Sequence, residues 1–483
     1  MRRGFFIALM MTALGRAVAA QAPAASSAPA TVWMLRDWSR VEMWRFFEPP
    51  AGGGNDDYAF GANRLFAGVQ RTARAYDFTA ALQYVQFGGL PSDAVGPGPL
   101  GTGAVYYAHA GRSDSRQVYL RYANIRVTRL IPRTTLQIGR MPYASGNEAV
   151  SGNSKIEAVR QQRVFARLIG EFGWSIYQRA YDGVRVDTAR SRWTATGFAF
   201  HPTQGGFEDA AGQMMPGVTV LGAAATVNSA PSQAPPAIQY QAFAYRYRDT
   251  RRVPQRPDNT GRTADAADVG INTFGVTVIT APPPRNGRQW DALLWVAAQT
   301  GSWYEQDHRA ASIAVEAGHQ WIAARWQPWL RGGYLYASGD GNPSDTRHGT
   351  FFEMLPTVRQ YAQSALYSQM NDTDLFAQLL ARPRPNINVR FDWHRVGLSS
   401  SRDGWYFGSG ATQQHGSIFG FATRPSFGAR HLATIEEGSI DYAIQRHWSI
   451  GGYLAVGRGG GVVAPAFAGR TLTFAFIENV LQF

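Results

Sequence analysis

The 483-residue sequence contains no cysteine, which excludes a disulfide framework and any thiolate metal site. It contains a single lysine, Lys155, so its formal net charge of +13 comes almost entirely from arginine. The arginines are spread along the chain without the long clusters of a nucleic-acid-binding segment. A basic chain of this kind indicates another anionic partner, such as lipid head groups or an acidic substrate.

Long hydrophobic runs are also missing. Beyond the N-terminus no segment approaches twenty unbroken apolar residues, so the sequence predicts no transmembrane helix. Residues 1–20 have the features of a secretory signal peptide: Arg2 and Arg3 precede a short apolar segment, and small residues at 17–20 offer a cleavage site. These features leave the periplasm, secretion or the outer membrane as the location of the mature protein.

Polar and apolar side chains alternate strictly over residues 386–396, which predicts an extended strand with two opposed faces. In a soluble sandwich the apolar face would meet a core and the polar face water. In an outer-membrane barrel the apolar face meets lipid and the polar face lines a wet lumen. The apolar positions are Ile387, Val389, Phe391 and Trp393, and the polar positions are Asn388, Arg390, Asp392 and His394.

From residue 38 to residue 483 strand-like stretches follow one another, without a long amphipathic helix or a break in composition. We count about eighteen strands, joined alternately by short turns and long loops, which is typical of outer-membrane barrels with periplasmic turns and extracellular loops. A soluble β-propeller or β-helix would show a repeating unit, and the sequence has none. We therefore predict an all-β fold: a transmembrane antiparallel barrel over 38–483, preceded by the signal peptide and a disordered Ala/Pro/Ser-rich segment over 21–37.

Three stretches resemble motifs of the bacterial alginate export family. Residues 340–356 resemble its pattern ASGD-xx-P-x-D-xxx-GTF-xx-LFP, residues 178–186 resemble RRSFDGVRL, and residues 136–146 resemble GRQELSYG. In the last motif Met141 and Pro142 replace the polar pair that follows Gly-Arg. The resemblance implies an outer-membrane β-barrel with a basic lumen. The best-known member of the family passes the polyuronate alginate from periplasm to exterior by passive diffusion.

A polyuronate carries one carboxylate per sugar, so a channel for it needs fixed cations that face water. The arginine guanidinium stays charged and pairs bidentately with carboxylate, and rings of arginine select anions. The alternative for each charged residue is that it only pairs across the lumen and fills it. The strand face of Arg140 is ambiguous, because Ile138, two residues before it and therefore on the same face, is apolar. We predict that the lumen and substrate contacts come from Arg390, Asp392, His394, Arg185, Asp187, Arg331, Arg64 and Arg140.

Tryptophans on several predicted strands are interpreted as a lipid-facing or interfacial girdle rather than as platforms for sugar stacking. Passive passage requires no cofactor, no metal and no catalytic residue. The six tryptophans are Trp44, Trp295, Trp321, Trp329, Trp393 and Trp448.

The favoured function is an outer-membrane channel for an anionic polysaccharide or a related anionic solute. The alternative is a general or specific porin for small carboxylate or aromatic nutrients, since both need a basic constriction. A third hypothesis, an outer-membrane enzyme, is suggested by His415 and Ser417, because a nucleophilic serine needs a base within reach. The expected partners are outer-membrane lipid and the anionic solute, with no nucleic acid; we expect a monomer, and periplasmic secretion partners stay open.

Overall fold

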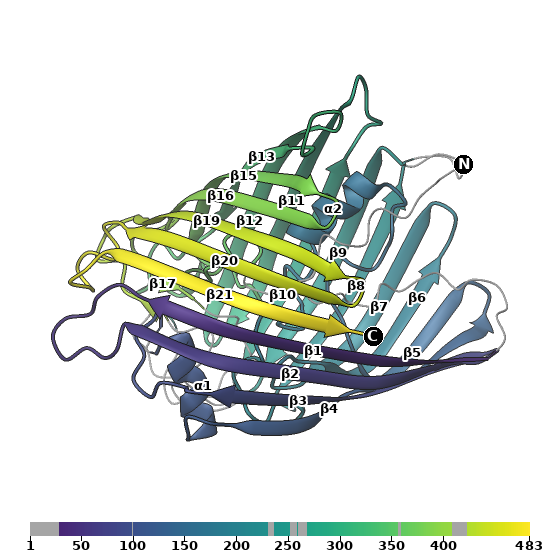
Figure 1. Cartoon of the computed structure of the whole chain (residues 1–483), viewed down its shortest axis with the longest axis horizontal. Helices are drawn as coiled ribbons and strands as arrows, with labels where there is room; N and C mark the ends of the chain where they lie inside the picture. Colours follow the sequence, from purple (N-terminus) through teal and green to yellow (C-terminus); the bar gives the residue numbers. More distant parts are fainter. Residues whose placement is uncertain are drawn as a thin grey trace.

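The computed structural model describes residues 29–98, 100–229, 236–251, 258, 268–355, 359–407 and 423–483. Its main sheet contains nineteen strands, one of which, the two-residue β14 (Arg347–His348), is a side branch on a loop. The other eighteen pair antiparallel, each with the next, and the last pairs with the first. The sheet therefore closes into a barrel (Figure 1), which confirms the predicted architecture.

The wall strands vary in length from the eight residues of β5 to the sixteen of β1. They are β1 (Ala30–Arg45), β2 (Asp57–Thr72), β3 (Tyr76–Gly88), β4 (Arg116–Ile131), β5 (Thr134–Met141), β6 (Tyr181–Ala189), β7 (Trp193–Pro202), β8 (Val218–Asn228), β9 (Ile238–Asp249), β10 (Val269–Thr280), β11 (Arg288–Trp303), β12 (Gln306–Trp321), β13 (Trp329–Ala337), β15 (Asp372–Arg384), β16 (Ile387–Gly397), β19 (His431–Gln445), β20 (Trp448–Gly459) and β21 (Thr471–Gln482).

The connections contain two helices, α1 (Thr102–Ala110) and α2 (Ser154–Arg163), and a separate strand pair, β17 (Trp405–Tyr406) with β18 (Thr423–Arg424). In the part of the chain that the structure describes, no helix is long and apolar enough to cross a membrane.

Closure joins the two ends of the wall. β21 pairs with β1 from Gln482 opposite Arg36 to Thr473 opposite Arg45, so these two strands leave no open sheet edge between them. β1 begins at Ala30 and pairs with β2 from its first residue. The prediction of disorder over 21–37 is therefore wrong for residues 30–37, while the signal-peptide prediction falls on residues outside the described ranges.

The alternation predicted at 386–396 is present in β16 and separates two faces. Asp392 and His394 are fully buried on the inward face, whereas Phe391, which directly precedes Asp392 in the same strand, is 53% exposed on the outward face. Large apolar side chains continue the outward band on other strands, for example Val315 on β12 and Leu454 on β20. The outward face thus has the apolar character of a lipid-facing surface, and polar groups turn inward.

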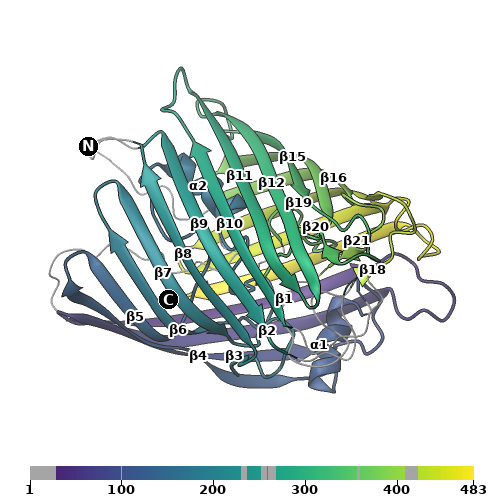
Figure 2. The same ribbon diagram turned by 180° about the vertical axis from the view of Figure 1, so that it is seen from behind.

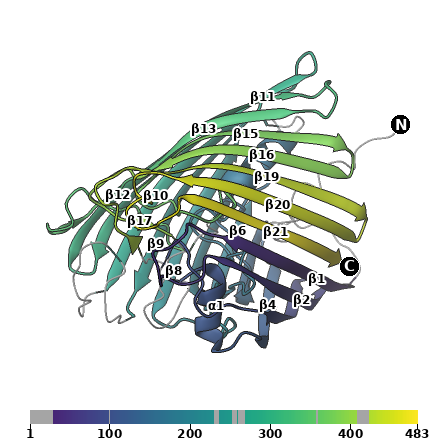
Figure 3. The ribbon, with the colours of Figure 1, turned by 60° about the vertical axis from the view of Figure 1, so that its left-hand side comes forward.

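The two ends of the barrel differ in their connections. Residues 73–75, 132–133 and 446–447 are short turns at one end, where the C-terminus also lies (Figure 3). Long loops, including residues 142–180 and 338–371, leave the opposite end. The connection between β11 and β12 is the exception, because it is short although it lies at the long-loop end.

Two of the long loops fold back into the barrel. Asn153, the N-cap of α2, donates hydrogen bonds to the carbonyls of Pro236 (2.7 Å) and Ala281 (3.0 Å), which belong to short turns at the far end of the wall. The loop over 142–180 therefore crosses the depth of the barrel. Figures 1 and 2, seen from opposite sides, both place α2 between the β19–β21 side and the β8–β10 side. We call residues 142–180 and 338–371 the two inward loops.

The outward band predicts a depth-dependent penalty for charge. Val315→Arg places a cation in the middle of the apolar face of β12 and should lower the free energy of unfolding by about 2–4 kcal/mol. The control, Ser302→Arg, lies outward at the long-loop end of β11 and should cost about 0–1 kcal/mol. Denaturant unfolding in lipid vesicles measures both, and equal losses would contradict a lipid-facing band.

Candidate functional site: a basic lumen

One cluster of the inward face centres on Arg331 of β13. Its Nη2 lies 3.1 Å from Glu316 Oε2 of β12, and its Nε lies 3.4 Å from Asp291 Oδ1 of β11. Arg163 of α2 approaches the same Glu316 carboxylate, with its Nε 3.1 Å away. All four side chains are buried, so wall carboxylates hold both a wall arginine and an arginine of an inward loop.

A second cluster brings together three residues that the sequence predicted. Arg390 pairs with Asp392 on the same strand and with Glu437 of β19 at 3.4 Å, while His394 faces Asp374 of β15. Arg390 also donates a hydrogen bond of 2.7 Å to the carbonyl of Tyr361 in an inward loop. The cluster therefore joins the wall to residues 338–371.

A third cluster surrounds Trp38 of β1. The guanidinium carbons of Arg40 and Arg64 lie 4.3 and 4.2 Å from the centre of its ring, within the range of cation–π contacts. Arg40 pairs with Glu42 and Glu478, at 3.0 and 3.1 Å. Arg64 instead donates to the carbonyl of Ser175 at 2.9 Å, and no described carboxylate lies within ion-pair distance of it.

The remaining predicted residues divide between the two faces. Arg185 and Asp187 form an inward ion pair of 2.8 Å on β6. Arg140 instead shares the parity of Ile138, which is 49% exposed outward, and pairs with Asp182 at 2.7 Å. The prediction that Arg140 lines the lumen is therefore corrected: its charge is satisfied on the outward side, where β5 ends, by Asp182 and the carbonyl of Leu120.

Sequence reasoning missed the arginines of the inward loops. Arg167 lies 4.1 Å over the ring of Trp295, and Arg359 lies 4.2 Å over the ring of Trp174. None of the three guanidinium nitrogens of Arg179 has a hydrogen-bond partner among the described residues, and the same holds for Nε and Nη2 of Arg359. The available signal covers α2 alone: Asn153 is a helix-capping residue, and Arg160 and Arg163, three residues apart, lie on one face of the helix; Arg167 lies beyond its end.

The six tryptophans do not form a single girdle. Trp321, Trp393 and Trp448 have outward parity, but Trp44, Trp295 and Trp329 are almost fully buried inward. A buried indole needs an acceptor for its N–H, and the lumen supplies carboxylates. Trp329 Nε1 donates to Asp291 at 2.7 Å, and Trp44 Nε1 donates to Glu42 at 3.2 Å.

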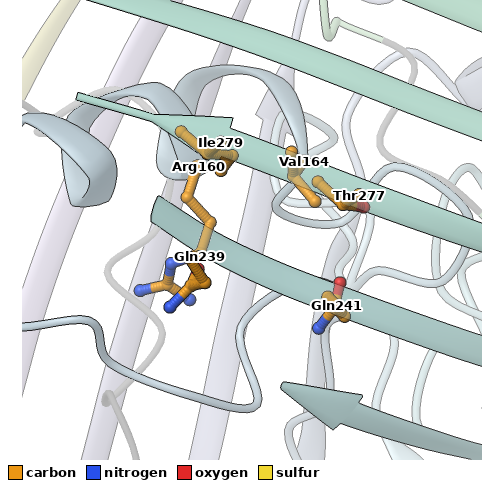
Figure 4. A pocket seen from close by; sticks show the side chains of 6 residues that line it. All are labelled: Arg160, Val164, Gln239, Gln241, Thr277 and Ile279. Carbon is orange, nitrogen blue, oxygen red and sulfur yellow. The ribbon is translucent and has the colours of Figure 1, made fainter. Parts of the chain in front are cut away.

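Figure 4 shows a small pocket where one inward loop meets the wall. Arg160 and Val164 of the loop face side chains of β9 and β10, including Gln239 and Thr277. Gln241, in the same pocket, donates hydrogen bonds to Glu148 of the loop and to Thr226 of β8. Polar contacts therefore fasten this loop along the wall as well as at the far end.

Burial perturbs two acids of the long loops. It raises the pKa of Glu353 to about 8, although Gln369 donates two hydrogen bonds to the carboxyl group. It also raises the pKa of Asp403 to about 6; this carboxyl group accepts hydrogen bonds from Thr350 and from the backbone N–H of Asp340. Both acids lie in segments that fold against one another inside the long-loop end.

The sequence matches the family described as Alginate export over residues 44–450. The chain belongs to the alginate export family. No curated protein matches the sequence significantly. Membership of this family, together with the barrel fold, places the protein in the bacterial outer membrane.

Similar solved structures include Acinetobacter baumannii OccAB4, with a TM-score of 0.55 and 8% identity over 95% of this chain and 99% of that chain. Pseudomonas aeruginosa OccK2 (OpdF) has a TM-score of 0.56 and 8% identity over 93% of this chain and 98% of its own. A second structure of OccK2, in complex with glucuronate, has a TM-score of 0.55 and 8% identity over 94% and 98%. Identities this low show a shared fold alone.

The pKa of Glu353 predicts a pH dependence of the inward loop over 338–371. Because the packed state raises the pKa from 4.5 to about 8, that state holds a proton that the released loop gives up above pH about 4.5. Packing should therefore weaken as the pH rises from about 5 to about 8 and level off above that. Amide hydrogen exchange over residues 359–371, corrected for intrinsic rates, measures this change.

Glu353→Gln keeps the side chain neutral and should abolish the pH dependence. The control, Asp345→Asn, removes a half-buried carboxylate of the same loop, which accepts a hydrogen bond from the Arg347 N–H, and should leave the dependence as in the wild type. Equal protection of the wild type at pH 5 and pH 9 would show that Glu353 does not hold a proton in the packed loop.

Proposed function

We propose that this member of the alginate export family is a monomeric channel for passive passage of an anionic, alginate-like polyuronate. The observation that carries the proposal is that all three guanidinium nitrogens of Arg179 and two of those of Arg359 are buried without a hydrogen-bond partner among the described residues. A buried cation without an acceptor is unfavourable, because burial removes the water that would solvate it. A carboxylate of a passing chain supplies the missing acceptor, and arginine binds it bidentately.

The residues around these arginines suit reversible binding of a polyuronate, which must be released again as it passes through the channel. Trp174 beneath Arg359, and Trp38 between Arg40 and Arg64, present apolar faces beside the cations. Wall carboxylates such as Glu42 and Glu478 compensate part of the positive charge. Partial compensation keeps single contacts weak, and conduction requires binding that is favourable but reversible.

The inward loops occupy the route, so passage of a polymer requires part of them to move aside. The two loops contact each other through backbone hydrogen bonds, from Leu355 N to the Leu168 carbonyl (2.9 Å) and from Gly170 N to the Leu355 carbonyl (2.7 Å). Single hydrogen bonds of this kind contribute about 0.5–1.5 kcal/mol, so a solvated polyanion can replace them.

A porin for small uronates or related carboxylates is the second candidate. It is favoured by the filled lumen, which suits a small solute, and by the glucuronate complex of OccK2, which has the same barrel fold. An enzyme receives no support from the family; His415 and Ser417, which suggested that hypothesis, lie outside the described residues.

Block of the single-channel current by oligouronates tests the proposal. The variant Arg179→Gln/Arg359→Gln should raise the half-blocking concentration at least about tenfold, since one hydrogen bond to a charged group is worth about 1.5 kcal/mol or more. Arg458→Gln is the control, because its side chain is 71% exposed on the outward side.

A neutral oligosaccharide of equal length should not block the wild type. Stronger block by monomeric glucuronate than by the oligomer, at equal carboxylate concentration, would favour the small-solute porin. An unchanged half-blocking concentration in the double variant would contradict the assigned role of these arginines.

A further inference from the structure

His394 of β16 has an arrangement that the passage of anions does not use. Its Nδ1 lies 2.9 and 3.1 Å from the two carboxylate oxygens of Asp374 on β15, and both side chains are fully buried. A carboxylate at Nδ1 holds the proton on that nitrogen, so the neutral ring presents a lone pair at Nε2. Nε2 makes no hydrogen bond with any described residue; the nearest carboxylate oxygen, Asp392 Oδ2, is 3.8 Å away.

Neighbouring strands bring further oxygen donors to the same place. Asp392 lies two residues before His394 and therefore on the same face, and its pairing partners are Glu437 on β19 and Gln378 on β15. Asp392 Oδ1 and Gln378 Oε1 are buried and, within the described part of the chain, have no hydrogen-bond partner. His394, Asp392 and Glu437 each offer one ligand atom within 4.8 Å of the others.

The charges of the cluster do not balance when the imidazole is neutral. Asp374, Asp392 and Glu437 provide three carboxylates, and Arg390 is the cation paired with two of them. With a neutral imidazole two negative charges remain in a buried position, and with a protonated imidazole one remains; an uncompensated buried charge is unfavourable. A divalent cation supplies the missing charge and also satisfies the unpartnered donors.

We propose that His394, Asp392 and Glu437 bind a divalent transition-metal ion such as Zn²⁺, with the Gln378 carbonyl as an additional oxygen ligand. Imidazole nitrogen and carboxylate oxygen are ligands that Zn²⁺ accepts, and an Asp374 carboxylate on the other ring nitrogen is the usual support for a metal-bound histidine. Arg390 keeps its contacts with Asp392 Oδ2 and Glu437 Oε1, while Asp392 Oδ1 turns to the metal.

The site would also fix an inward loop. The loop over 338–371 reaches the same side chains: the Gln363 N–H donates to both Glu437 oxygens, and Tyr367 Oη donates to Asp374 at 2.6 Å. Binding of the metal would hold these carboxylates in place and thereby stabilise the packed loop. This inference does not depend on which anion the channel passes.

The test is metal stoichiometry in the full-length, untagged barrel. The protein is refolded with Zn²⁺, freed of loose metal by a weak chelator and gel filtration, and analysed by mass spectrometry for metal content. We expect one Zn²⁺ per chain in the wild type and loss of it in His394→Gln and Asp392→Asn. The control, His308→Gln, removes another buried histidine, whose nitrogens bond to His348 and Gln299, and should retain the metal.

Folding of each variant is checked by its gel mobility before and after heating. Because Asp392→Asn disturbs the pair with Arg390, Co²⁺ absorption of the wild type provides a second measurement: ligand-field bands that disappear on Zn²⁺ addition report specific coordination. Absence of bound metal from the folded wild type, or equal metal in His394→Gln, would overturn the proposal. Channel currents are not measured, so failure here would leave the proposed function untouched.

Discussion

In lipid, every backbone N–H and C=O must find a partner within the protein, and this constraint fixes the rest of the structure. It is met by pairing β21 with β1, which closes the wall without an open edge. Once the wall is closed, strand periodicity sends alternate side chains to lipid or to the lumen. Charged groups can then be placed only inside or near the two ends, as the exposed Phe391 and the buried Asp392 of β16 illustrate.

The lumen therefore collects charged side chains that are buried from water. Several guanidinium groups of the wall are compensated by carboxylates on neighbouring strands, as Arg331 is by Asp291 and Glu316. Two long loops fold inward and bring further arginines, among them Arg179 and Arg359, which form no ion pair with a carboxylate in the described ranges. The difference between compensated and uncompensated cations separates residues that build the wall from residues that can bind a moving anion.

The sequence was sufficient to predict features that depend on a period of two. The strand at 386–396, the inward positions of Arg185 and Arg331, and the succession of turns and loops follow from alternation. The prediction for Arg140 was wrong, because Gly139 breaks the polar pattern. Arg140 lies at the end of β5, beyond the lipid-facing band, where an outward charge can be satisfied. The loop arginines could not be placed, because irregular segments have no period that reports whether they fold inward.

The measurement that tests the account most directly is the reversal potential of the wild-type channel in a potassium chloride gradient across a planar bilayer. A lumen governed by uncompensated arginines predicts anion selectivity, with a reversal potential that moves toward the chloride equilibrium value. This reversal potential should fall toward zero as ionic strength rises, because salt screens the fixed charges. A cation-selective or unselective current through the folded barrel would contradict the claim that these arginines control passage.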